Sequence, residues 1–104
     1  MLHKEQIVVA IKSAVLQVLP DAQVILFGSQ VNEKAHDESD WDILVLINST
    51  VTPKLKQTLH NTIFPLSVSA GVFINFLLVA KKDWQQSPSF YSLKSSIANN
   101  SISI

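Results

Sequence analysis

Two aspartates separated by one residue, Asp40 and Asp42, are the side chains in this sequence best placed to do chemistry. The apolar run at 43–46 follows them directly and predicts a buried strand. Residues two apart on a strand point to the same side, so both carboxylates are expected close together on one face. Like charges at that separation repel, and such a pair is typical of a site that a cation neutralises.

A second polar corner precedes the aspartates. Gly28 and Ser29 follow an apolar run that ends in Phe27, and ten residues separate Ser29 from Asp40. The chain has only two glycines, so one at this corner is informative, because glycine lets another group approach the backbone closely. Serine offers a hydroxyl and a backbone N–H to an anionic oxygen. A phosphate-binding corner beside paired carboxylates predicts a site for a metal-bound nucleoside triphosphate.

The spacing of these residues resembles the motif of the nucleotidyltransferase superfamily that includes DNA polymerase β, which is Gly-Ser, ten residues, Asp-any-Asp. It is most similar to the minimal stand-alone branch, whose members are often paired with HEPN-domain proteins. The resemblance covers nearly the whole chain. It implies a nucleotidyltransferase fold and a two-metal Mg²⁺ site at Asp40 and Asp42. It also implies that a nucleoside triphosphate, expected to be ATP, binds at Gly28 and Ser29.

The third position of the catalytic set departs from that family. There, a third acidic residue on the strand after the second helix helps to hold the catalytic metal and takes a proton from the attacking hydroxyl. The matching position here is Asn75, the only polar residue inside VFINFLLVA. An amide brings no charge and accepts no proton at neutral pH, and losing a positioned general base typically costs about 10²–10⁴ in rate. Asn75 is therefore a degenerate third catalytic position or, alternatively, a buried amide hydrogen-bonded at a strand edge.

The loop after Ser29 departs from the family as well. Active members tend to carry Arg-any-Arg-Gly where this chain has Gln-Val-Asn-Glu at 30–33. Two cations that would contact the triphosphate are therefore missing, and Glu33 adds a negative charge. We interpret Lys34 as a solvated loop residue rather than a substitute for them.

Hydrophobic periodicity predicts the elements that position these residues. It predicts a helix over 4–19, strands over 23–27 and 41–47, a second helix from Pro53, a strand over 72–80 and helical segments from Asp83 to about 98. Pro65 either ends the second helix or kinks it before Gly71, and residues 101–104 either form a short edge strand or fray. The fold class is α/β (α+β), a small mixed β-sheet backed by helices in the order α-β-β-α-β-α, and residues 1–104 are expected to form a single domain.

The composition narrows the range of functions. Charged residues make up 15% of the chain and the net charge is zero, so no basic face is expected for direct nucleic-acid binding. So few charges favour a surface partly covered by a partner or a second copy, as in a homo-oligomer. Without cysteine there is no disulfide or thiolate metal site. The N-terminal stretch lacks a signal-peptide core and no apolar run reaches about 20 residues, so we expect a soluble cytoplasmic protein and no membrane partner.

Two hypotheses about function follow. In the first, the chain is an enzyme that transfers a nucleoside monophosphate from an Mg²⁺-bound nucleoside triphosphate to a hydroxyl on a partner protein. The resemblance implies that this partner is a HEPN toxin modified on tyrosine, which makes the chain antitoxin-like. In the second, the site is catalytically degenerate and the fold is a binding module that neutralises a HEPN-type partner by contact.

Overall fold

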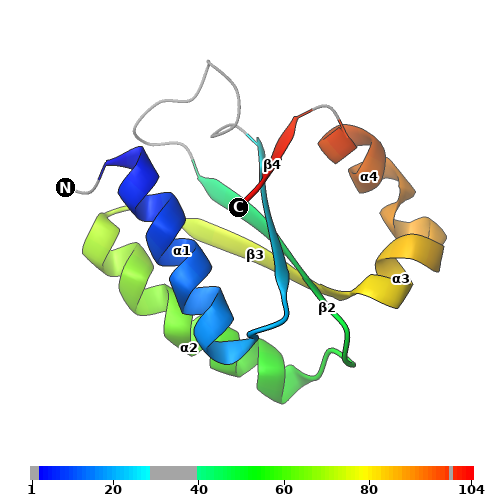
Figure 1. Cartoon of the computed structure of the whole chain (residues 1–104), viewed down its shortest axis with the longest axis horizontal. Helices are drawn as coiled ribbons and strands as arrows, with labels where there is room; N and C mark the ends of the chain where they lie inside the picture. The colour runs from blue at the N-terminus through cyan, green and yellow to red at the C-terminus, as the bar shows by residue number, and fades with distance from the viewer. Residues whose placement is uncertain (1–2, 29–39, 99) are drawn as a thin grey trace.

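The computed structural model describes residues 3–28, 40–98 and 100–104. Its elements begin with the predicted helix-strand-strand-helix-strand-helix order and continue with a 3₁₀ turn, a further helix and a short strand (Figure 1). They are α1 (Lys4–Val18), β1 (Gln23–Phe27), β2 (Trp41–Ile47), α2 (Pro53–Ala70), β3 (Ile74–Ala80), α3 (Lys81–Gln86), η2 (Pro88–Phe90), α4 (Tyr91–Ala98) and β4 (Ser101–Ser103).

The four strands form one mixed sheet in the order β3-β2-β1-β4. β2 pairs parallel with β3, whereas β1 pairs antiparallel with both β2 and β4. β2 lies inside the sheet because its apolar run is buried on both faces, which is the environment that continuous hydrophobic strands require. The predicted class, a small mixed sheet backed by helices, is confirmed.

The helices cover the two faces of the sheet unequally. α1 and α2 lie together on one side, and α3 and α4 lie on the other (Figure 1). Alternate residues of each strand supply the two cores, as the period of a strand requires. The core under α1 and α2 contains Ile7, Ile11, Val15, Val24, Leu26, Trp41, Ile43, Val45, Ile47, Leu59, Ile63, Ala70 and Leu78. The smaller core under α3 and α4 contains Leu44, Leu46, Val79 and Ile97.

Pro65 does not end α2, because the helix continues through it. The helix starts at Pro53 after Thr52, whose hydroxyl accepts a hydrogen bond from the N–H of Leu55 at 3.1 Å. It runs through Pro65 to Ala70 and ends at Gly71, which has a left-handed φ of 70°. The exposed Pro65 removes one helical N–H, while the buried Leu59, Ile63 and Ala70 anchor the helix on both sides of it.

Three boundaries differ from the sequence prediction. α1 ends at Val18 rather than at residue 19, β3 begins at Ile74, two residues later than predicted, and α3 begins at Lys81 rather than Asp83. Of the two alternatives for residues 101–104, the structure has the edge strand, because residues 101–103 pair with Phe27, Leu26 and Ile25 of β1. This pairing joins segments distant in the sequence, which periodicity does not report.

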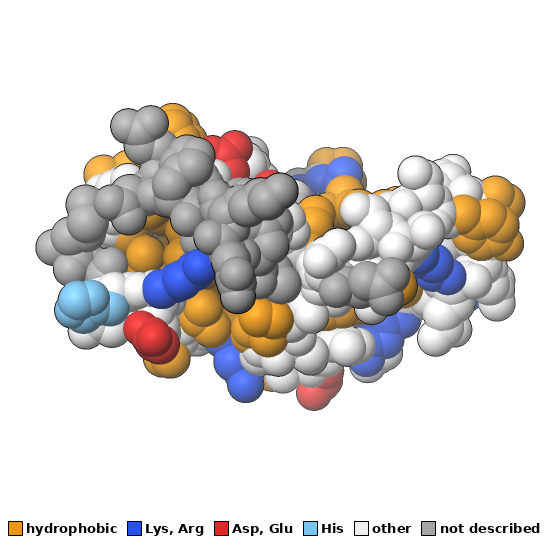
Figure 2. Space-filling model, turned by 90° about the horizontal axis from the view of Figure 1, so that it is seen from above, with side chains coloured by type: hydrophobic (Ala, Val, Ile, Leu, Met, Phe, Trp, Pro, Cys, Tyr) orange, Lys and Arg blue, Asp and Glu red, His pale blue; other side chains and the backbone are white. Residues whose placement is uncertain are grey.

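The surface carries few charges. Lysine side chains stand apart from one another on the described part of the face in Figure 2, with hydrophobic and uncharged polar side chains between them. Within the described residues, no helix combines the length and the hydropathy needed to cross a membrane.

Candidate active site

The two aspartates stand at the beginning of β2, on either side of a buried anchor. Trp41 is 2% exposed and packs in the core under α1 and α2, and its N–H donates to the carbonyl of Phe73 at 2.8 Å. Side chains alternate along the strand, so Asp42 takes the opposite face, that of α3 and α4. Asp40 is exposed and Asp42 is half-buried. The tryptophan between them thus fixes the segment that carries both carboxylates.

Strand register brings Asn75 beside these carboxylates. Asn75 of β3 is the parallel partner of Asp42. Its amide nitrogen Nδ2 donates to Asp40 Oδ2 at 3.2 Å and to Asp42 Oδ1 at 3.3 Å. The side chain is exposed, so the alternative of a buried strand-edge amide is wrong. One nitrogen within hydrogen-bond distance of both carboxylates means that the two aspartates converge on a common point.

Gly28 closes the other side of Asp42. Phe27 is the antiparallel partner of Asp42, so Gly28 follows directly beyond the sheet, with a φ of 82°. A Cβ added to Gly28 would lie 2.5 Å from Asp42 Oδ2. Any other residue would therefore overlap the carboxylate and would also adopt an unfavourable backbone conformation. Ser29, the positions 30–33 and Lys34 lie outside the described residues.

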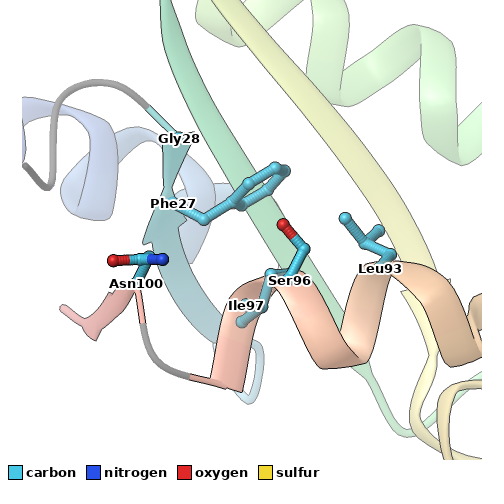
Figure 3. Close-up of a pocket in the computed structure, with 6 residues that line it drawn as sticks. All are labelled: Phe27, Gly28, Leu93, Ser96, Ile97 and Asn100. Atoms are coloured by element: carbon cyan, nitrogen blue, oxygen red, sulfur yellow. The ribbon is translucent and has the colours of Figure 1, made fainter.

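A hollow of about 290 Å³ adjoins Gly28, between the end of β1 and α4. Figure 3 shows the Phe27 side chain directed from β1 towards α4, where Leu93 and Ser96 lie. The remaining lining residues are Ile97 and Asn100. The sequence analysis did not identify the four lining residues from the α4 region, which are Leu93, Ser96, Ile97 and Asn100. The approach of α4 to the end of β1 leaves no signal in local spacing.

The donor set fits a hard divalent cation. Carboxylate and amide oxygens are the ligands that Mg²⁺ takes in proteins. Because a single atom of Asn75 lies within hydrogen-bond distance of both Asp40 and Asp42, the two carboxylates face a common point and would be the groups that hold a cation. Among the described residues no group of three His, Cys, Asp or Glu side chains gathers. The candidate ligands are therefore two carboxylates and one amide.

Comparison with solved structures places the fold. The chain is similar to spectinomycin adenyltransferase from Enterococcus faecialis, with ATP and spectinomycin, at a TM-score of 0.68 and 21% identity over 81% of this chain. It spans only 37% of that protein. It also matches a toxin–antitoxin complex with AMP-PNP at a TM-score of 0.64 and 19% identity, covering 97% of this chain and 72% of the other.

A third similar structure is the complex of a tri-AMPylated Shewanella oneidensis HEPN toxin with its MNT antitoxin. Its TM-score is 0.63 and its identity 17%, over 97% of this chain and 71% of that one. Comparison with curated protein sequences finds no match. The nucleotidyltransferase domain model, in contrast, matches residues 8–99. This stretch contains every element described above except the start of α1 and β4, and on this basis the chain belongs to the nucleotidyltransferase domain family.

Proposed function

We propose that this chain transfers a nucleoside monophosphate from an Mg²⁺-bound nucleoside triphosphate, ATP, to a hydroxyl group of a partner protein. The observation that carries the proposal is the convergence of Asp40 and Asp42 beside Gly28 in a member of the nucleotidyltransferase domain family. The proposed site residues are Asp40, Asp42 and Asn75 for metal and catalysis, and Gly28 and Ser29 for the nucleotide.

The carboxylates of Asp40 and Asp42 hold the magnesium in this proposal. When bound, magnesium neutralises charge on the phosphates and stabilises the charge that develops during transfer. Gly28 leaves its backbone open on the side of Asp42, where a side chain would fill the space. A phosphate can therefore approach the end of β1 without meeting a Cβ.

The reaction is an in-line displacement at the α-phosphorus. The acceptor hydroxyl oxygen forms a bond to that phosphorus, and the bond from the phosphorus to the oxygen bridging to the β-phosphate breaks, so pyrophosphate leaves. The hydroxyl proton passes to solvent, since the carboxamide of Asn75 does not accept it at neutral pH. The chain's own contribution is then to align the reactants beside Asp40 and Asp42, which is the main source of catalysis in phosphoryl transfer.

The hollow at the end of β1 supports a place for the nucleoside. It adjoins Gly28 and is lined by the ring of Phe27 and by Ser96 and Asn100 of the α4 region. An aromatic surface with a few polar groups is typical of small-ligand sites, and its volume of about 290 Å³ suits part of a nucleotide rather than the whole.

The nature of the acceptor is supported by similar structures and by the surface. Two of the similar structures are toxin–antitoxin complexes, and in one of them the HEPN toxin carries AMP groups. We therefore propose a HEPN-type protein as acceptor, which makes this chain antitoxin-like, with residues 1–104 acting as a single domain. The low share of charged residues favours a covered surface. Since ATP is a cytoplasmic metabolite, we place the reaction in the cytoplasm.

The test is a transfer assay with α-labelled ATP, Mg²⁺ and the protein encoded by the neighbouring gene. We expect label on the partner and an equal amount of pyrophosphate. Asp40→Ala should lower the rate about 10²-fold or more, because it removes one of two charged ligands. The matched control is Asp21→Ala, which deletes an exposed carboxylate in the turn between α1 and β1 and should leave the rate unchanged. Equal rates for the two variants would refute the assigned site.

The second candidate function is neutralisation of the partner by contact alone. Asn75 in the third position and the absence of arginine from the sequence favour it, because both weaken the handling of a triphosphate. The same assay separates the two functions. If the wild type transfers no label while Asp40→Ala inhibits the partner as well as the wild type does, the binding function holds and the enzymatic one is wrong.

A further inference from the structure

The amide of Asn75 lies within hydrogen-bond distance of both carboxylates that would hold a cation. Its amide nitrogen lies 3.2 Å from Asp40 Oδ2 and 3.3 Å from Asp42 Oδ1. An amide N–H₂ has two donor hydrogens, so one group can serve one oxygen of each carboxylate. Since these carboxylates repel each other when ionised, two donors between them stabilise their close approach.

The backbone holds Asn75 in this position. It lies in register with Asp42 in the parallel pair of β3 with β2. Trp41 donates its N–H to the carbonyl of Phe73, which fixes the start of both strands relative to each other. On the opposite side, Gly28 lies against the second oxygen of Asp42. The amide therefore meets both carboxylates because of sheet pairing rather than through a flexible side chain alone.

The amide also limits the charge available to metal ions. Asp40 and Asp42 together carry two negative charges when ionised, which a single divalent cation balances. Asn75 adds a carbonyl oxygen but no charge, and it offers that oxygen to a cation only after its N–H₂ turns away from the carboxylates. A second cation would thus have no third carboxylate among the described residues to hold it.

We infer that Asn75 is a positioning residue that keeps Asp40 and Asp42 together without metal and sets the site to hold one divalent ion with the nucleotide, instead of two. This inference rests on the proposed function, because it concerns the same carboxylates. It changes the expected chemistry of the site, since the described residues supply charged ligands for one ion, and position 75 offers the acceptor hydroxyl neither a charged metal ligand nor a base.

The substitution Asn75→Asp separates this role from a merely structural one. It replaces two hydrogen bonds with a third like charge, so the metal-free protein should unfold at a lower temperature than the wild type. The added carboxylate should also raise the affinity for the ion about tenfold, since affinity follows the number of charged ligands. The sign of the effect on melting temperature should thus reverse between chelator and saturating Mg²⁺.

The number of ions is measured directly with Mn²⁺ and the non-hydrolysable analogue α,β-methylene-ATP, by electron paramagnetic resonance of free and bound Mn²⁺. We expect one Mn²⁺ per wild-type chain with the analogue bound, and two for Asn75→Asp. The matched control is Asn48→Asp, the same change at an exposed residue after β2, which should bind one ion and show no reversal of the melting temperature.

The outcomes distinguish this inference from the proposed function. Two ions on the wild type with the analogue bound would overturn the single-ion site and leave nucleotide binding intact. No ion and no analogue on the wild type would overturn both. One ion on Asn75→Asp, with a metal-free melting temperature equal to that of the wild type, would show that Asn75 does not position the carboxylates.

Discussion

The two faces of the sheet differ in how completely they are covered. The face under α1 and α2 is packed along the whole length of the central strand, from Trp41 to Ile47. On the other face, α3 and α4 cover the far part of the sheet, and the part at the beginning of β2 carries the two aspartates. Leu44 and Leu77, which pair in register on this face, mark the boundary between its covered and open parts. Leu44 is 0% exposed, whereas Leu77 is 36% exposed.

This difference teaches how so small a chain holds an exposed polar site without losing its fold. Trp41 lies between the two aspartates but points into the packed face, where it is 2% exposed. Within residues 40–42, Trp41 is therefore buried on one side of the sheet, and the carboxylates of Asp40 and Asp42 lie on the other. Packing on the covered face stabilises the strand, so Asp40 and Asp42 need not contribute to stability themselves.

The largest effect that tests this comparison is on the packed face. Leu59→Ala removes a side chain of α2 that is 0% exposed. We expect it to lower the free energy of unfolding by about 2–5 kcal/mol, because the surroundings close only partly around the cavity. Urea denaturation followed by tryptophan fluorescence measures this change.

Leu77→Ala is the matched control on the open face. It is the same substitution at a residue that is 36% exposed, and we expect a clearly smaller loss, about 1 kcal/mol or less. A loss as large as that of Leu59→Ala would mean that the two faces contribute equally to stability, and the comparison would fail.

An intermediate effect is expected at the two glycines with positive φ. Gly28→Ala and Gly71→Ala both place a side chain in the left-handed region, which costs roughly 1–2 kcal/mol. At Gly71 the new Cβ meets nothing within 4 Å, whereas at Gly28 it meets Asp42 Oδ2 at 2.5 Å. Both variants should therefore lose stability, and only Gly28→Ala should also lose nucleotide binding.

Equilibrium dialysis with labelled ATP and Mg²⁺ measures nucleotide binding by the two variants, and urea denaturation measures their stability. Gly71→Ala serves as the control because it ends α2, on the packed face, with the same kind of backbone strain. Undiminished ATP binding by Gly28→Ala would place the nucleotide elsewhere than at the end of β1.

Sequence alone predicts β1 and β2 with their bounds and the shared face of the aspartates, because both follow from local spacing. The apolar run after Asp42 predicts β2 with its observed bounds, and alternation predicts which residues enter which core. Asn75 is likewise found from the sequence, because it is the only polar residue inside VFINFLLVA. These features depend only on the period of a strand, which the sequence displays directly.

The rest depends on contacts between distant segments. One amide nitrogen of Asn75 contacts both carboxylates because β3 pairs with β2 in parallel register. No local sequence pattern encodes that register. Pro65 favours a break in α2, and burial of the helix on both sides of it overrides that preference. The hollow lined by Phe27 and Ser96 likewise needs α4 to reach β1 from about seventy residues away.

The smallest expected effect is at Phe73, beside the open part of the sheet. Its side chain is 76% exposed, while its backbone carbonyl accepts the hydrogen bond from Trp41. Phe73→Ser removes the ring and keeps that carbonyl, so the free energy of unfolding should change by no more than about 0.5 kcal/mol. Urea denaturation beside Leu59→Ala gives the contrast. A loss above about 1 kcal/mol would show that the ring packs on the protein, because only buried apolar area contributes that much, and the face around Asn75 would then be covered rather than open.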